Sequence, residues 1–320
     1  MLTLLRLLQD GRFHSGQALG AALGVSRSAV WKQLQHLEAE LSLPVYKVRG
    51  RGYRLARPLV LLEAERLLEA GRASAWPVFI HESLDSTNGQ AFRLLEQGVE
   101  APFLVLAERQ TSGRGRRGRR WVSPFADNLY YSLVLRVEGG ARQLEGLSLV
   151  VGLAVLQTLR QFGVADAGLK WPNDVLVGGR KMAGILLELS GDPADVCHVV
   201  IGIGINANMT ADEEEIDQPW TSMARELGAQ IDRNALVSRL NEHLRGYLAR
   251  LRQSGFAALQ AEWEAGHLWQ GLPVLLTAGN RQIQGVVLGI NEQGALRMSV
   301  EGVEQVFSGG ELSLRLRHDS

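Results

Sequence analysis

Six arginines and three glycines lie between Arg109 and Arg120, with no acidic residue among them. Glycine lets the backbone turn sharply and approach a ligand closely. Exposed backbone N–H groups and guanidinium groups together suit a polyphosphate or a carboxylate. Apolar runs typical of strands precede and follow this loop, at Phe103–Ala107 and Asn128–Leu135. The sequence therefore predicts an anion-binding loop between two strands of one sheet.

The sequence of this loop also permits interpretations other than ligand binding. Gly113–Gly118 formally matches the GxGxxG pattern of dinucleotide sites, but such a site needs a helix to begin there, and arginines crowd that space. No Gly-Lys-Ser/Thr sequence follows, which excludes a Walker A loop. The remaining alternative is a solvated basic loop or a nucleic-acid patch. The interleaved glycines favour the ligand-binding loop.

A second group of polar residues follows a predicted strand at Val78–His81. Ser86, Thr87 and Asn88 carry hydroxyl and amide groups that can donate to and accept from a neutral polar ligand. Thr87 and Gln90 also fit a capping box, so helix capping alone is an alternative explanation. The two roles are compatible because a helix N-terminus offers both kinds of group.

A third group surrounds a predicted hairpin. Lys170 and Asp174 bound the sequence Lys-Trp-Pro-Asn-Asp, and Lys181 follows the turn Gly178–Gly179. The two lysines thus flank an acid at strand ends near glycines. A plain surface position is an alternative for Lys181, and a weaker one for the rigid Trp-Pro-Asn-Asp turn.

The composition is that of an ordinary globular protein. The 320 residues are 46% hydrophobic and 21% charged, enough for two or three domains with one sizeable core. The single cysteine, Cys197, excludes an intrachain disulfide and suits a reducing cytosol. Met1–Leu8 lacks the features of a secretory segment, and the longest apolar run, Gly146–Leu156, is too short to span a bilayer. We therefore expect a cytoplasmic protein.

Charge is zero overall but unevenly distributed. The chain holds 34 basic and 34 acidic side chains, yet residues 1–60 hold nine basic and three acidic ones, a net charge of +6. The rest of the chain is therefore −6. This asymmetry predicts an N-terminal module that binds a polyanion.

The first 60 residues have the pattern of a helix-turn-helix followed by a hairpin. Ser15 and Ser26 can cap the second and third helices. The third helix has an apolar stripe from Val30 to Leu41 and a polar opposite face. The predicted elements are helices at Leu2–Leu8, Ser15–Leu23 and Ser26–Leu41, and strands at Val45–Val48 and Tyr53–Leu55.

This module resembles the winged helix-turn-helix family of DNA-binding proteins. The resemblance implies that the third helix enters the major groove and that the hairpin contacts phosphate or the minor groove. The alternative, a small helical packing or dimerisation module, is disfavoured by the charge, the caps and the basic hairpin. The residues implicated in DNA binding are Ser26, Arg27, Ser28, Lys32, Arg49 and Arg51.

Two further parts follow Pro58. Helices and strands fill the chain up to about residue 270, and from Leu272 short strands alternate with turns, as in a small β-barrel. The predicted domains are 1–60, 61–270 and 271–320. The predicted helices are Leu61–Leu68, one ending at Leu95, Gly146–Phe162, Asp232–Arg252 and Gly255–Trp263. The predicted later strands are Val175–Val177, Ile185–Leu189, Val199–Ile205, Val274–Thr277, Gln282–Leu288, Ala295–Val300 and Val303–Phe307.

Five short motifs occur in a specific order and spacing along the chain. They are Asp85–Asn88, Gly113–Arg119, Lys170–Asp174, Arg180–Gly184 and Gly202–Asn206. With these motifs the chain resembles, over nearly its whole length, the bifunctional biotin–protein ligase and biotin operon repressor family of bacteria. The resemblance implies an α+β fold: a winged helix-turn-helix, a central mixed-sheet catalytic domain shared with lipoate ligases, and an SH3-like barrel.

The resemblance also implies the ligand-binding residues. Four residues would be catalytic. Lys170 and Lys181 would offset charge developing at the α-phosphate, Arg116 would hold the adenylate as the arginine-rich loop closes over it, and Asp174 would position the acceptor lysine or the metal. Metal ligands are otherwise not assigned. The implied biotin site is Ser86, Thr87, Asn88, Gln110, Arg114, Gly115, Arg116 and Lys181. The implied ATP and adenylate site is Arg116, Arg117, Arg119, Trp121, Asn173 and Asn206.

The implied reaction has two steps. Biotin carboxylate attacks ATP to give biotinyl-5′-adenylate and pyrophosphate, with Mg²⁺ screening the phosphates, and a lysine of the carboxyl carrier protein of acetyl-CoA carboxylase then attacks the acyl group. Because the mixed anhydride hydrolyses easily, a loop that closes and excludes water is expected. An adenylate-bound homodimer on operator DNA is also implied. The segment Met209–Trp220, where the family orders a loop over adenine, is acidic here.

Two rival functions stay open at this point. One is a transcription regulator whose central domain senses biotin without ligating it. The other is a lipoate ligase or protein acyltransferase relative, which the arginine-rich loop and the N-terminal module disfavour.

Overall fold

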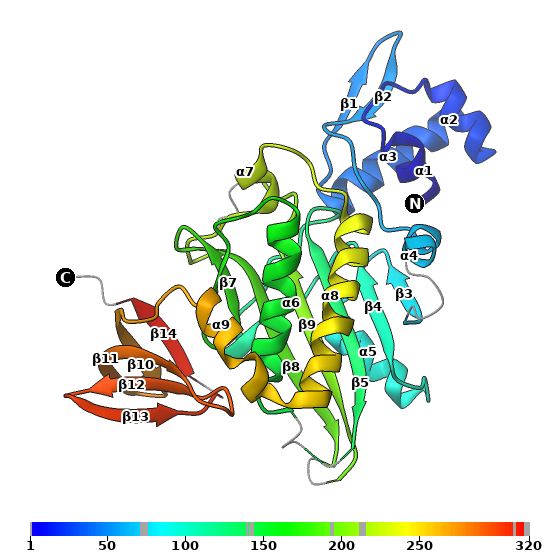
Figure 1. Cartoon of the computed structure of the whole chain (residues 1–320). Coiled ribbons are helices and arrows are strands. Elements are labelled where there is room, and N and C mark those ends of the chain that lie inside the picture. The colour runs from blue at the N-terminus through cyan, green and yellow to red at the C-terminus, as the bar shows by residue number, and fades with distance from the viewer. Residues whose placement is uncertain are drawn as a thin grey trace.

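The chain folds into three parts that follow one another along the sequence (Figure 1). The computed structural model describes residues 2–70, 76–138, 140, 144–192, 195–210, 216–309 and 312–316. A helical module with a hairpin lies at one end, a seven-stranded sheet with helices forms the centre, and a five-stranded antiparallel sheet lies at the other end. This arrangement confirms the predicted α+β fold. In the described part of the chain, no helix is both long and apolar enough to cross a membrane.

The N-terminal module has the predicted elements: α1 (Leu2–Leu8), α2 (Gly16–Leu23), α3 (Arg27–Leu41), β1 (Val45–Val48) and β2 (Gly52–Leu55). The side chains of Ser15 and Ser26 accept backbone N–H bonds at the starts of α2 and α3. The predicted stripe of α3 is buried. The hairpin pairs in register, with Val45 opposite Leu55.

The core of this module extends into the central part of the chain. Phe125 and Ala126, which follow the arginine-rich loop, are buried among the leucines of α1, α2 and α3. Arg109, at the start of the loop, donates a hydrogen bond to the carbonyl of Glu40 near the end of α3. Both ends of the loop therefore rest on the N-terminal module.

The predicted helix at Leu61–Leu68 begins three residues later, as α4 (Ala64–Ala70). Leu61 and Leu62 lie outside the helix because a buried ion pair holds this segment. The Leu62 N–H donates to Glu108 Oε1 at 2.6 Å, and the fully buried Arg233 pairs with the same carboxylate. Hydrogen bonds to these buried groups outweigh the local helical pattern.

The central sheet has the strand order β3-β4-β5-β9-β8-β7-β6. Only β3 and β4 are parallel; the other neighbouring pairs are antiparallel. The predicted second arm at Ile185–Leu189 is part of a longer strand, which begins directly after the Gly178–Gly179 turn. The strands are β3 (Val78–His81), β4 (Phe103–Ala107), β5 (Leu129–Val137), β6 (Gly168–Lys170), β7 (Asp174–Val177), β8 (Arg180–Gly191) and β9 (Cys197–Ile205).

Helices cover the two faces of this sheet unequally. Figure 1 shows α6 (Leu147–Gln161) and α8 (Arg233–Ser254) side by side over one face. Leu104 and Leu106 of β4 pack in the core beneath them, whereas Phe103 and Val105 pack with α5 (Thr87–Glu96). Because alternate strand residues point to opposite faces, α5 lies on the other face. It contacts β4, β5 and β9, and the arginine-rich loop reaches β8 through Arg114, which binds Glu188.

The C-terminal sheet has the order β13-β12-β11-β10-β14. Its last strand was not predicted, nor was the short helix α7 (Met223–Leu227). The predicted helix at Gly255–Trp263 is a 3-10 turn at Phe256–Leu259 followed by α9 (Gln260–Gly266). The strands are β10 (Pro273–Ala278), β11 (Arg281–Ile290), β12 (Leu296–Val300), β13 (Val303–Phe307) and β14 (Leu312–Leu316).

Candidate active site

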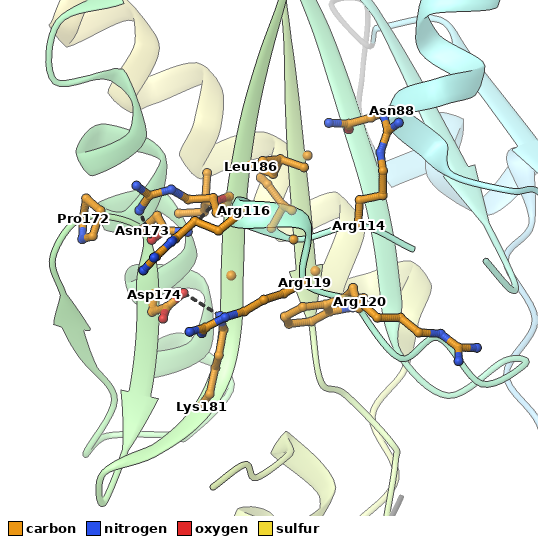
Figure 2. A pocket seen from close by; sticks show the side chains of 18 of the residues that line it. Asn88, Arg114, Arg116, Arg119, Arg120, Pro172, Asn173, Asp174, Lys181 and Leu186 are labelled. Carbon is orange, nitrogen blue, oxygen red and sulfur yellow. Dashed lines mark hydrogen bonds and ion pairs between the residues drawn. The ribbon is translucent and has the colours of Figure 1, made fainter. Parts of the chain in front are cut away.

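One cavity collects nearly all of the ligand-binding residues expected from the sequence. It lies on the α5 face of the sheet, where the N-terminus of α5, the arginine-rich loop and strands β5, β8 and β9 meet (Figure 2). Asn206 does not line it and lies in an adjoining hollow. The expected residues in the cavity are Ser86, Thr87, Asn88, Gln110, Arg114, Gly115, Arg116, Arg117, Arg119, Trp121, Lys170, Asn173, Asp174 and Lys181.

Glycines form the floor of this cavity. A Cβ at Gly202 would lie 2.6 Å from Asn88 Oδ1, and one at Gly204 would lie 2.5 Å from the ring of Trp121. Side chains at these two positions would collide with the residues above them. The glycines of β9 thus let Asn88 and Trp121 lie directly against the sheet.

Neutral polar groups gather at one end of the cavity. Ser86 accepts the backbone N–H bond that caps α5, so the capping residue is Ser86 and the predicted capping box at Thr87 is wrong. Thr87 binds Gln110 instead: its N–H and hydroxyl both donate to Gln110 Oε1, at 2.8 and 3.1 Å. Ser132 of β5 lies 2.8 Å from Thr87 Oγ1 and 2.5 Å from Asn88 Oδ1. These groups form one largely buried network, which we call the polar end.

Two lysines and a carboxylate form the opposite, charged end. Lys181 Nζ lies 2.7 Å from Asp174 Oδ1, and Lys170 Nζ lies 3.6 Å from Asp174 Oδ2. Burial lowers the pKa of Lys170, and the neighbouring Asp174 partly offsets this. Two cations face one carboxylate, so the charged end keeps a positive charge that suits an anionic ligand.

The arginine-rich loop covers the cavity between these ends. The backbone N–H of Trp121 donates to the Gly113 carbonyl at 2.8 Å and closes the loop on itself. Arg117 has a φ of 59°, a left-handed conformation that residues other than glycine seldom adopt. Arg116 Nη1 donates to Asn173 Oδ1 at 2.8 Å, and burial lowers the pKa of its guanidinium. Figure 2 shows Arg116 lying beside Asn173 at the charged end.

The C-terminal sheet completes the wall of the cavity. Arg116 Nη2 also donates to the carbonyl of Leu312 on β14, at 3.4 Å, and Ser313 and Leu314 line the cavity beside it. No local pattern indicated this contact, because it joins residues 196 positions apart. Ser132 and Glu188 were missed as well. A polar side chain inside an apolar strand pattern was the available signal for both.

Asn206 has a structural role in the hollow next to the cavity. Its Nδ2 donates to the carbonyls of Thr221 and Lys181, at 3.0 and 3.3 Å, and so ties the segment after Pro219 to β8. Trp220 borders the same hollow, under the guanidinium of Arg225. Of the predicted acidic loop Met209–Trp220, residues 211–215 lie outside the described residues.

Models of known families match all three parts of the chain. The Biotin/lipoate A/B protein ligase family matches residues 80–206, which include the cavity floor and the arginine-rich loop. A model described as HTH domain matches residues 1–54, and the Biotin protein ligase C terminal domain matches residues 271–315.

Similarity to curated proteins extends over the full order of these parts. A Salmonella typhimurium protein named bifunctional ligase/repressor BirA is 41% identical over 98% of this chain and 97% of its own length. The chain belongs to the bifunctional biotin ligase/repressor family. This membership confirms the family expected from the five motifs.

Other members of the wider biotin ligase group match a shorter part of this ligase/repressor chain. The Paracoccus denitrificans protein named biotin--[acetyl-CoA-carboxylase] ligase is 37% identical over 71% of this chain and 96% of its own length. The solved biotin protein ligase from Aquifex aeolicus, in complex with biotin and ATP, has a TM-score of 0.67 at 32% identity, covering 75% of this chain and 99% of that one. This structural match therefore leaves out a quarter of this chain.

The N-terminal module of this ligase/repressor family member presents a polar surface. Arg27, Ser28 and Lys32 are exposed on α3, opposite its buried stripe. The hydroxyl of Ser26 is used for the helix cap, and it lies 2.9 Å from that of Ser28. In the hairpin, Arg49 and Arg51 are exposed, and Arg51 lies 4.3 Å above the ring of Phe13.

Proposed function

We propose that this protein is an ATP-dependent biotin–protein ligase that also binds DNA as a transcriptional repressor. One observation carries the proposal: a single cavity joins a neutral polar end to a cationic end under an arginine-rich loop. Biotin needs neutral donors and acceptors for its ureido ring and a cation for its carboxylate. Membership of the ligase/repressor family supports the same conclusion and disfavours a regulator without ligase activity.

We place the ureido ring of biotin at the polar end. There, Ser86, Thr87 and Asn88 offer hydroxyl and amide groups, and Gln110 is oriented by Thr87. The thiophane ring and valeryl chain would run over the glycine floor, under Arg114 and Gly115. The carboxylate would then lie near Lys181. This placement is supported by the residues that line the cavity.

Adenylation would occur at the charged end. Lys181, Lys170 and Arg116 would stabilise negative charge that develops as the biotin carboxylate displaces pyrophosphate from the α-phosphate. Trp121, Arg117, Arg119 and Asn173 would hold the nucleotide. Asn206 would contribute through the chain segment that it fixes, because its Nδ2 already donates to two carbonyls, and its Oδ1 would be the atom left to accept from the nucleotide.

Mg²⁺ would screen the phosphates of ATP. Asp174 is the one carboxylate among the described residues that line the cavity, and no group of three or more His, Cys, Asp or Glu is arranged to hold a metal among the described residues. The ion would therefore take most of its ligands from phosphate and water, as Mg²⁺ often does. Asp174 would also position the attacking lysine of a carrier protein.

The partners we propose are the biotin carboxyl carrier protein of acetyl-CoA carboxylase and operator DNA. The carrier is suggested by a relative named for ligation to acetyl-CoA carboxylase. Arg27, Ser28, Lys32, Arg49 and Arg51 would contact DNA, and an adenylate-bound homodimer would span two half-sites. We expect the protein to act in the cytoplasm, where its substrates are.

Calorimetric titration tests the ligand half of this proposal. Biotin should bind in the absence of ATP, and addition of ATP with Mg²⁺ should yield biotinyl-5′-adenylate and pyrophosphate. The matched competitor is lipoate, which has a carboxylate but no ureido ring. Binding of lipoate in preference to biotin would contradict the assignment of the polar end.

Gly202→Ala should weaken biotin binding about 5- to 150-fold, because overpacking of a filled site typically costs about 1–3 kcal/mol. The new Cβ would lie 2.6 Å from Asn88 Oδ1 and would displace the amide from the polar end. Gly246→Ala, on α8, is the matched control, since nothing lies within 4 Å of its Cβ. Biotin affinity equal to that of the control would contradict the floor assignment.

Arg116→Ala should speed release of the adenylate more than it weakens biotin binding. The guanidinium joins the loop to Asn173 and to the Leu312 carbonyl, and it lies at the phosphate end of the cavity. Loss of a charge-assisted bond costs about 1.5–3 kcal/mol, so release should accelerate about 10- to 150-fold. Rapid filtration measures this release. A variant that retains the adenylate as long as the wild type does would show that Arg116 does not hold it.

A further inference from the structure

Glu188 of β8 contacts both the polar end of the cavity and the loop that covers it. Its Oε2 accepts a hydrogen bond from Asn88 Nδ2 at 2.7 Å. Arg114 Nη2 donates to the same carboxylate, at 3.1 Å to Oε2 and 3.3 Å to Oε1. Figure 2 shows Arg114 reaching from the loop towards Asn88. One carboxylate thus joins a residue below the ligand space to a residue above it.

The contact with Asn88 fixes the direction of its side-chain amide. A carboxylate only accepts hydrogen bonds, so Asn88 must turn Nδ2 to Glu188 and leave Oδ1 facing Ser132, 2.5 Å away. The hydroxyl of Ser132 faces two acceptors, Asn88 Oδ1 at 2.5 Å and Thr87 Oγ1 at 2.8 Å, because Thr87 gives its own hydroxyl proton to Gln110 Oε1. Glu188 therefore sets which atom of Asn88 donates and which accepts at the polar end.

The buried position of Asn88 makes this orientation matter. Only 3% of Asn88 is exposed, so water is a poor substitute for a lost partner. A buried amide without its partner carries the cost of desolvation, and its neighbours lose their fixed donor and acceptor roles. Ligand binding at the polar end therefore depends on Glu188, although Glu188 is remote from the reacting carboxylate of the ligand.

The contact with Arg114 is weaker and depends on the loop. The side chains of Arg114 and Glu188 are 49% and 30% exposed, so solvent screens the pair. Arg114 lies two residues before Arg116 in the same loop. The pair forms only while the loop lies over the cavity, because Glu188 is fixed in the sheet. It therefore stabilises the closed loop relative to an open one.

We propose that Glu188 is a positioning residue that orients Asn88 for biotin and latches the arginine-rich loop through Arg114. The proposal rests on the proposed function, since it takes the enclosed ligands to be biotin and its adenylate. Glu188 does not touch the reacting atoms. Its two contacts predict two separable effects, one on biotin binding and one on retention of the adenylate.

Three single variants and one double variant separate these effects. Glu188→Gln keeps an oxygen that can accept from Asn88 but removes the charge that holds Arg114. Biotin affinity should then stay within about twofold of wild type, and adenylate release should be about two- to fivefold faster, as in Arg114→Ala. The double variant Arg114→Ala with Glu188→Gln should release no faster than either single variant. Glu188→Ala should in addition weaken biotin binding about tenfold, because Asn88 loses its partner.

Calorimetry with biotin and a chase of preformed biotinyl-adenylate supply the two measurements. Glu304→Gln is the matched control, because it neutralises an exposed carboxylate paired with Arg297 on the C-terminal sheet. If Glu188→Ala fails to fold, the Gln and Arg114 variants still test the latch. Wild-type release from Glu188→Gln, or additive effects in the double variant, would overturn the proposal. A wild-type protein that forms no adenylate would instead overturn the proposed function.

Discussion

Replacing Lys181 with alanine is expected to slow adenylate formation by about two to three orders of magnitude, the usual cost of removing one group that stabilises developing charge. Lys181 Nζ lies 2.7 Å from Asp174, whereas Lys170 remains 3.6 Å from it. Without Lys181, the biotin carboxylate would face Asp174, and only Lys170 would remain to neutralise the charge of Asp174. Pyrophosphate release at saturating biotin and ATP measures this effect.

The neighbouring residue on the same strand supplies a matched control. Arg180→Ala also removes one cation, but Arg180 is exposed and pairs with Glu226 at 2.9 Å, away from the cavity. It should therefore release pyrophosphate at nearly the wild-type rate. An unchanged rate of pyrophosphate release in Lys181→Ala, or an equal loss of rate in both variants, would show that Lys181 is not a catalytic residue.

The second large effect concerns DNA. Arg27→Ala combined with Lys32→Ala should weaken binding to operator DNA about 30-fold or more if both residues contact base edges, because each such contact contributes about 1–3 kcal/mol. If both residues meet phosphates, the slope of log affinity against log salt should fall by about 2. Both side chains are exposed on α3, so the fold and the biotinylation activity should persist. Fluorescence anisotropy across a salt series measures both quantities.

A control of equal charge is available outside the N-terminal module. Arg136→Ala with Arg239→Ala also removes two solvent-accessible cations, each of which pairs with a nearby glutamate. Operator binding that falls equally in both double variants would show a general charge effect and contradict the winged-helix assignment. Deletion of residues 1–60 is a poorer test, because it would expose Phe125, which is 2% exposed in the intact chain.

Elements with strong local signals could be predicted from the sequence. The caps Ser15 and Ser26, the stripe of α3 and the glycine turn before β8 depend on residues close to one another in the chain. The motifs that line the cavity could also be recognised from the sequence, because each places several polar residues at the end of a strand or helix. The residues they identified converge in one cavity, except Asn206.

Features that depend on distant contacts could not be predicted. The start of α4 is moved by a buried ion pair with Arg233, more than 100 residues away from Glu108. The wall supplied by Leu312 depends on where the C-terminal sheet docks. Glu188 and Ser132 are single polar residues in strands, and only the folded sheet brings them beside Asn88. Local patterns carry no information on such pairings.

Transfer of labelled biotin to a purified carrier-protein domain of acetyl-CoA carboxylase is the most direct test of the ligase function. We expect ATP-dependent label on one lysine of the domain, with release of AMP and pyrophosphate, and no label when that lysine is replaced by arginine. Binding of biotin and ATP without any transfer would contradict the ligase function and would make the protein a sensor. Transfer of lipoate in place of biotin would contradict it equally.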